Sequence, residues 1–177
     1  MEYSKLYDEV EKLKDYKEIK LIHDLSDMML CDMKGGLYNT PVMSPEDVKN
    51  RLGFLKYEEK EKFIVITCNS VNEIIGIHEI TSGLINQVPI HPREAFVEAI
   101  KDRAVSVIFA HNHPSGSLDP STEDMAITKV LCAAGRILQI PVMDHLIISY
   151  RGFTNICRQD PSLFEKTFPD KSAMKTN

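Results

Sequence analysis

Three features are absent from this sequence, and each absence excludes a class of protein. No apolar run reaches the roughly 20 residues that a membrane-spanning helix needs, and the first twenty residues alternate acids with lysines instead of resembling a signal peptide. We therefore expect no membrane partner. The cysteines Cys31, Cys68, Cys132 and Cys157 form no Cys-x-x-Cys pair. This scatter predicts free thiols of a cytoplasmic protein, not a disulfide framework or a thiolate zinc cage.

The third missing feature is a surplus of positive charge. The formal net charge at pH 7 is −5, which argues against binding of nucleic acid through a general basic field. A local patch would be the only remaining route, and its residues would be Lys49, Arg51, Lys101, Arg103 and Arg136. Scattered bases more often form a solvated face, so the charge does not support nucleic acid as a partner.

The residues that are present predict one α/β domain. With 43% hydrophobic residues, a chain of 177 residues can bury one core. Apolar and β-branched runs predict strands at 62–69, 73–80, 104–110 and 141–149. Helix-start residues and apolar residues at helical spacing predict helices at 44–55, 91–103 and 121–139. This order predicts a mixed sheet flanked by helices.

Residues 1–43 predict an amphipathic helix and a linker outside that domain. Tyr3, Leu6, Val10 and Leu13 follow one another at 3-4-3 spacing, and the segment 34–41 is rich in Gly, Asn and Pro. The helix either packs on the domain or pairs with a partner, which would give a homo-oligomer. The domain then covers 44–157, and residues 158–177 are expected to form a C-terminal tail that is loosely ordered after Asp160.

The stretch HNHPSGSLDPSTED (111–124) follows the third predicted strand. Side chains alternate along a strand, so His111 and His113 project to the same side if the strand continues. Two imidazoles at this spacing suit one zinc ion, and a catalytic zinc needs a third protein ligand. Asp124 can supply it, because Ser121 is a good helix N-cap and places Asp124 at the third helical position.

Each half of this pattern also has a purely structural interpretation. Ser-x-x-Asp resembles a helix-capping box, and a lone His-x-His is often a surface loop feature. The combination of a buried strand, His-x-His at its end, a Pro/Gly loop and a polar helix start favours metal binding.

The spacing of these four residues matches a known signature. His-x-His, seven residues, Ser, two residues and Asp resembles the motif of the JAB/MPN (JAMM) metalloproteases, here as His111, His113, Ser121 and Asp124. The strings AHNHPSG, HPREAF and DHLIIS are similar to the RadC-like branch of that superfamily, over about residues 44–156. The resemblance implies a three-layer, cytidine-deaminase-like fold with a mixed sheet between helices.

The resemblance also implies a role for each residue. His111, His113 and Asp124 would hold Zn²⁺, and Ser121 would hydrogen-bond near the bound water or the developing oxyanion. JAMM enzymes use a glutamate just ahead of a strand as general base, which implies Glu61, with Glu79 as the second choice. From composition alone, Glu61 is a solvated charge in a Lys/Glu run.

Asp144 and His145 match the family string as well. Asp144 would either orient a ligand histidine, or begin a strand and be satisfied by its neighbours. We favour the second alternative.

Taken together, these residues predict a zinc-dependent hydrolase of peptide or isopeptide amide bonds. The alternative is a metal-stabilised protein-interaction or DNA-repair-associated module without hydrolytic activity. Residues 1–43 do not resemble the helix-hairpin-helix segment of longer RadC proteins, which weakens the DNA-repair interpretation. A zinc deaminase is excluded because its His-x-Glu and Pro-Cys-x-x-Cys motifs do not occur.

Overall fold

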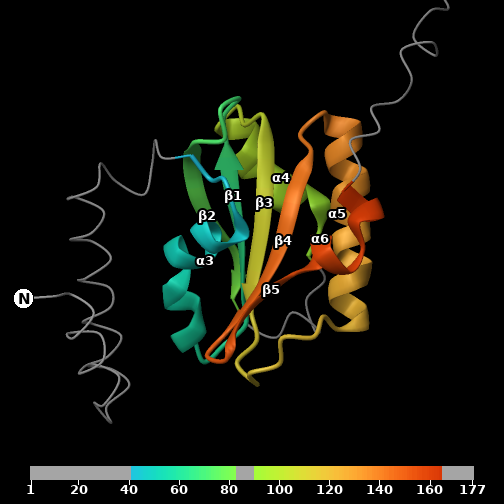
Figure 1. Ribbon diagram of the computed structural model, residues 1–177. Helices are drawn as coiled ribbons and strands as arrows, with labels where there is room; N and C mark the ends of the chain where they lie inside the picture. The colour runs from blue at the N-terminus through green and yellow to red at the C-terminus, as the bar shows by residue number, and fades with distance from the viewer. Residues whose placement is uncertain (1–40, 83–89, 165–177) are drawn as a thin grey trace, which may run out of the picture.

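The computed structural model describes residues 41–82 and 90–164 (Figure 1). The predicted N-terminal helix and most of its linker, together with Cys31, lie outside the described residues. In the part that is described, no helix is both long and apolar enough to span a bilayer.

A five-stranded mixed sheet forms the centre of the domain, in the order β2-β1-β3-β4-β5. Its strands are β1 (Lys62–Cys68), β2 (Ile74–Ser82), β3 (Ser106–Asn112), β4 (Val142–Ser149) and β5 (Gly152–Asn155). β3 and β4 are parallel, and every other neighbouring pair is antiparallel. The parallel pair needs a crossover, which α5 (Thr122–Leu138) supplies. The predicted α/β fold with a mixed sheet is confirmed.

Helices cover both faces of this sheet (Figure 1). On one face, α4 (Pro92–Lys101) and α5 pack on the inward side chains of β1 and β3, such as Phe63, Val65 and Phe109. On the other face, α3 (Pro45–Arg51) and the 3-10 helix η1 (Gly53–Tyr57) pack on Ile64, Ile66 and Ile108. The odd-numbered residues therefore face one side of the sheet and the even-numbered residues face the other. This is the period of two that a strand buried on both faces requires.

Local sequence signals account for the start of α3. The Ser44 hydroxyl accepts a hydrogen bond from the Asp47 backbone N–H at 3.2 Å, and the Asp47 carboxylate accepts from the Ser44 N–H at 2.9 Å. Pro45 occupies the first helical turn, where its missing N–H is not needed. The predicted cap is confirmed, although the α-helix ends at Arg51 and continues only as η1.

β3 is shifted relative to its prediction in a way that matters for the site. The sequence predicted a strand at 104–110, but β3 begins at Ser106 and extends through His111 and Asn112. Because side chains alternate, His111 continues the face of Val107 and Phe109, on which α5 lies. Asn112 points to the opposite side, towards the start of β1.

The end of the described chain is more ordered than its sequence suggested. β5 was not predicted, because its four residues, Gly-Phe-Thr-Asn, carry no alternating apolar pattern. α6 (Ile156–Gln159) and the 3-10 helix η2 (Pro161–Phe164) follow it. Part of the segment that we expected as a loose tail therefore packs on the domain, because Leu163 and Phe164 cover the α5 side of the core. The Arg136 guanidinium donates to the Leu163 carbonyl at 3.1 Å.

Candidate metal centre

The three predicted ligands converge at the end of β3. His111 Nε2 lies 3.1 Å from Asp124 Oδ1, and His113 Nε2 lies 3.3 Å from Asp124 Oδ2. The two imidazole Nε2 atoms are 3.0 Å apart. All three side chains are nearly enclosed, with 1%, 11% and 7% of His111, His113 and Asp124 exposed. The group could hold a metal ion.

A backbone carbonyl fixes the orientation of His113. Its Nδ1 lies 3.1 Å from the Ser117 carbonyl oxygen, in the loop that follows β3. A carbonyl only accepts, so Nδ1 carries the proton and Nε2 is left to face Asp124 and His111. The backbone N–H of His113 is also bound, to the Ile148 carbonyl of β4 at 3.0 Å. The second histidine is therefore held although it lies beyond the last residue of β3.

Strong electrostatic coupling joins these groups. Burial by itself would raise the pKa of Asp124, but hydrogen bonds from His111 and His113 outweigh it and hold that pKa well below its usual range. The hydrogen bond with Asp124 raises the pKa of His113, against the opposing effect of burial. The arrangement keeps Asp124 ionised, which is the state that a metal ligand needs.

Asp124 has a structural role, and only one of its two oxygens is used for it. Its Oδ2 accepts hydrogen bonds from the Ser121 backbone N–H at 2.8 Å and from the Ser121 hydroxyl at 2.6 Å, which completes a capping box at the start of α5. The structural interpretation of Ser-x-x-Asp is therefore correct. Oδ1 faces His111 and is left over for a ligand role. Ser121 orients Asp124, and its catalytic role stays a prediction.

Two further polar side chains, which the sequence did not reveal as site residues, lie behind His111. His145 of β4, fully buried, places its Nε2 2.9 Å from His111 Nδ1. Its Nδ1 lies 2.6 Å from the Thr128 hydroxyl oxygen, and Thr128 donates to the backbone carbonyl of Asp124 at 2.6 Å. Thr128 could have been found as a polar residue one turn beyond Asp124, on the buried face of α5.

Asp144 does not orient a ligand histidine, and its carboxylate is satisfied partly by the adjacent residue and partly by β5. Its carboxylate accepts hydrogen bonds from the His145 backbone N–H at 2.7 Å and from the Asn155 side chain at 2.8 Å. Burial raises the pKa of Asp144, against these hydrogen bonds. The imidazole of His145, in contrast, is not satisfied locally but reaches across to His111.

Asn112 holds the segment ahead of β1 against the site. Its Oδ1 accepts from the Lys62 backbone N–H at 2.8 Å, and its Nδ2 donates to the carbonyls of Glu58 and Lys60 at 3.2 and 3.1 Å. This clamp fixes the backbone on both sides of Glu61. The charge of Glu61 acts in the direction that raises the pKa of His113.

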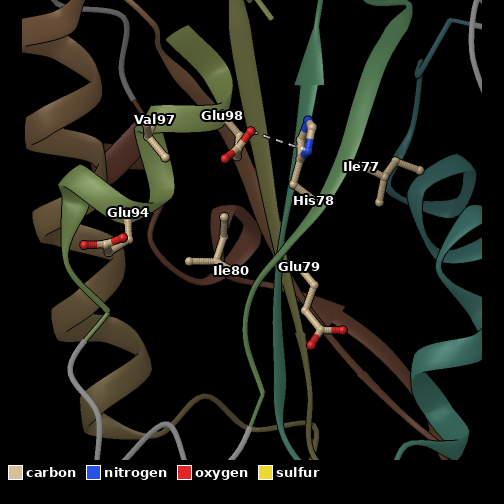
Figure 2. Close-up of a pocket in the computed structure, with 7 residues that line it drawn as sticks. All are labelled: Ile77, His78, Glu79, Ile80, Glu94, Val97 and Glu98. Carbon is tan, nitrogen blue, oxygen red and sulfur yellow. Dashed lines mark ion pairs between the residues drawn. The ribbon is translucent and has the colours of Figure 1, made fainter. Parts of the chain in front are cut away.

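Glu79, the second choice for a general base, has a different environment. It pairs with Lys62 at 3.0 Å and its side chain is 43% exposed. It lines a separate pocket of about 460 Å³ between β2 and α4, together with His78, Glu94 and Glu98 (Figure 2). The charge of Glu61 therefore acts on His113, whereas Glu79 pairs with Lys62. The role of Glu61 as a general base stays a prediction.

The loop between β3 and α5 depends on one glycine. Gly116 has φ of +85°, and a Cβ built there would lie 2.5 Å from the Tyr150 hydroxyl. The β4–β5 turn thus packs directly on the loop, and Ser149 donates a hydrogen bond to the Gly116 carbonyl at 3.4 Å. Only glycine satisfies both conditions, the positive φ and the close contact.

Comparison with known proteins agrees with this geometry. The model of the RadC-like JAB domain family matches residues 42–160. A UPF0758 protein of Methanospirillum hungatei is 38% identical over 138 residues, which are 73% of this chain and 61% of the relative. UPF0758 proteins of Moorella thermoacetica and Caldanaerobacter subterraneus are 40% and 50% identical over 68% and 62% of the chain. The chain spans 53% and 48% of their lengths, about half.

Proposed function

Because the chain belongs to the RadC-like JAB domain family, we propose that it is a zinc-dependent hydrolase of peptide or isopeptide amide bonds. One observation carries the proposal: two imidazole nitrogens and one carboxylate oxygen converge in a nearly enclosed site at the end of β3. Three protein ligands leave one position of a tetrahedral zinc for solvent, which is the pattern of catalytic and not of structural zinc sites.

The donor set fits zinc better than the other common divalent ions. Imidazole suits zinc, whereas Mg²⁺ and Ca²⁺ prefer oxygen ligands. Donors on a tetrahedral zinc are about 3.3–3.4 Å apart when the bonds are ~2.0–2.1 Å. Here the two imidazole Nε2 atoms are 3.0 Å apart and His111 Nε2 is 3.1 Å from Asp124 Oδ1, and the three ligand atoms all lie within 4.8 Å of one another. When bound, zinc would lower the pKa of a water to ~7 and polarise the scissile carbonyl.

Glu61 is the residue that we propose as general base. It would take a proton from the attacking water and pass it to the leaving amine, which typically contributes 10²–10⁴-fold to a rate. Two observations support the assignment: its charge acts on His113, and Asn112 fixes the backbone on both sides of it. We propose that Ser121 contributes to the oxyanion site when its hydroxyl turns from Asp124 to substrate.

A direct experiment measures zinc content and hydrolysis together. Wild-type protein should bind one zinc per chain and cleave at least one member of a panel of peptides and isopeptide-linked proteins. Glu61→Gln should keep the zinc and lose about 10²–10⁴-fold in rate. The matched control is Glu59→Gln, an exposed carboxylate of the same Lys/Glu run, which should leave both values unchanged. Equal rates for the two variants would refute the role of Glu61.

A metal-stabilised interaction module is the second candidate, with DNA-repair association as one version of it. It is favoured by the Ser121 hydroxyl, which donates to Asp124 at 2.6 Å and so stabilises a helix start instead of an open site. In this case zinc would raise the melting temperature while no member of the panel is cleaved. The free thiols of Cys68, Cys132 and Cys157 suit a reducing compartment, and we propose a cytoplasmic location for either candidate.

A further inference from the structure

We propose that His145 and Thr128 are positioning residues that fix the proton of His111 on Nδ1, so that Nε2 is the nitrogen offered to the metal. The proposal rests on the metal-binding part of the proposed function and needs no hydrolysis. The observation behind it is a continuous hydrogen-bond chain. It runs from His111 through His145 and Thr128 to the backbone carbonyl of Asp124.

The direction of this chain follows from its last member. The Asp124 carbonyl oxygen can only accept, so the Thr128 hydroxyl donates its single proton to it across 2.6 Å. With that proton committed, the Thr128 oxygen can only accept on its other side. The atom facing it there, at 2.6 Å, is His145 Nδ1, which must therefore carry a proton.

The next step passes the direction on to His111. His145 is fully buried, and an imidazolium there would incur a large desolvation cost without a carboxylate in contact. A neutral His145 protonated on Nδ1 has a lone pair on Nε2. That lone pair lies 2.9 Å from His111 Nδ1, so His111 donates from Nδ1. Nε2 of His111, which faces Asp124 Oδ1 and His113, is then the nitrogen of this ring that is left to bind a cation.

Packing around the His145 ring prevents the hydrogen-bond chain from rearranging. The His145 ring stands edge-on to Phe63 at 5.3 Å and to Phe109 at 6.2 Å between ring centroids. A flipped ring would place carbon atoms against Thr128 and His111, and both would lose a partner. The hydrogen-bond chain fixes the Nδ1 proton of His111, just as the Ser117 carbonyl fixes the Nδ1 proton of His113. Each histidine ligand thus has its Nδ1 proton fixed by a separate partner, as metal-bound histidines generally require.

The chain also connects two of the ligands to each other. It begins on the imidazole of His111 in β3 and ends on the backbone of Asp124 in α5, the residue whose carboxylate faces the same imidazole. Loss of the Thr128 hydroxyl should therefore loosen His111 without removing any ligand atom. Losses of such outer partners typically cost 10–100-fold in metal affinity.

The test compares three variants of the full-length protein by zinc titration. Thr128→Val removes the hydroxyl and keeps the shape, and we expect its zinc affinity to fall by about 10–100-fold. Thr128→Ser keeps the hydroxyl and should stay within about threefold of wild type. The control is Thr67→Val, because Thr67 is equally buried and donates to Asp102 at 2.6 Å, but lies near the end of β1 that is away from His111. It should lose stability and keep its zinc affinity.

A second readout decides the proposal even if Thr128→Val does not fold. Long-range ¹H–¹⁵N NMR spectra of the wild-type histidines report which ring nitrogen carries the proton. We expect His145 and His111 to be protonated on Nδ1, with and without zinc. A proton on Nε2 of His145, or equal zinc affinities of Thr128→Val and Thr67→Val, would overturn the proposal. If wild type binds no zinc, the proposed function fails. The NMR tautomers would still show whether the hydrogen-bond chain has the proposed direction.

Discussion

Replacing Asn112 by Asp tests the account of how the segment before β1 is held. The Asn112 side chain is 1% exposed and satisfies three backbone groups: it accepts from Lys62 N–H and donates to the carbonyls of Glu58 and Lys60. Asn112→Asp keeps the shape and the acceptor for Lys62. It replaces the donor by an oxygen that faces two carbonyl oxygens, at the positions now 3.2 and 3.1 Å away.

The magnitude follows from these contacts. Two hydrogen bonds are lost at about 1 kcal/mol each, and a buried carboxylate without a cationic partner adds several kcal/mol. We expect Asn112→Asp to lower the free energy of unfolding by about 3–5 kcal/mol at pH 7. Asn112→Ala leaves three groups unsatisfied but buries no charge, so its expected cost is about 2–4 kcal/mol. The introduced carboxyl would have a raised pKa, so the loss that its charge causes should shrink as pH falls towards about 4.

The assay is urea unfolding followed by circular dichroism, at about pH 7 and about pH 4.5, because the loss that the introduced charge causes should be smaller at the lower pH. Asn50→Asp, the same chemical change at an exposed position of α3, is the control and should stay within about 0.5 kcal/mol of wild type. If Asn112→Asp is no more destabilising than this control, the clamp does not hold the segment, and the placement of Glu61 loses its physical basis.

Three further predictions concern the metal group and its loop. Asp124→Asn keeps an acceptor for the helix cap but should weaken zinc binding, measured by competition with a chelator, by more than about 100-fold, since even outer partners are worth 10–100-fold. Because the pKa of His113 is raised, its contribution to the stability of metal-free protein is complete below its unfolded pKa of about 6.5 and is lost as pH rises through the folded value. Urea midpoints should therefore fall above about pH 6.5, while zinc affinity rises over the same range; a flat midpoint would contradict the coupling to Asp124. Gly116→Ala should lower the free energy of unfolding by about 1–3 kcal/mol, because of the positive φ at Gly116 and the clash of the new Cβ with Tyr150. Gly53→Ala is the control and should cause no such loss, because the space around its Cβ is open. Equal melting temperatures of the two variants would contradict this prediction.

Local patterns in the sequence were sufficient for the parts of the site that lie close together in the chain. The proposed ligands His111 and His113 follow from strand alternation, and the proposed ligand Asp124 follows from a capping pattern that begins at Ser121. The Pro/Gly loop between them indicated a return of the chain, and Gly116 does provide the positive φ for it. These features depend on neighbours within about fifteen residues, so propensity and spacing predict them.

The supporting contacts could not be predicted in the same way. His145 is 34 residues from His111, and their contact depends on the parallel register that sets Phe109 opposite His145. Asn112 reaches backbone groups about 50 residues earlier in the chain, across the antiparallel β1–β3 pair. Register between strands is decided by packing of the whole sheet, and a shift of one residue would reverse the face of every side chain. A single sequence does not contain that information in any local window.

The most direct test of the account is a crystal of zinc-loaded protein measured at the zinc absorption edge. We predict one anomalous peak per chain, bonded to Nε2 of His111, Nε2 of His113 and a carboxylate oxygen of Asp124 at ~2.0–2.2 Å, with a water in the fourth position. A peak bonded to cysteine sulfur, a fourth protein ligand in place of the water, or no peak between these three side chains would contradict it.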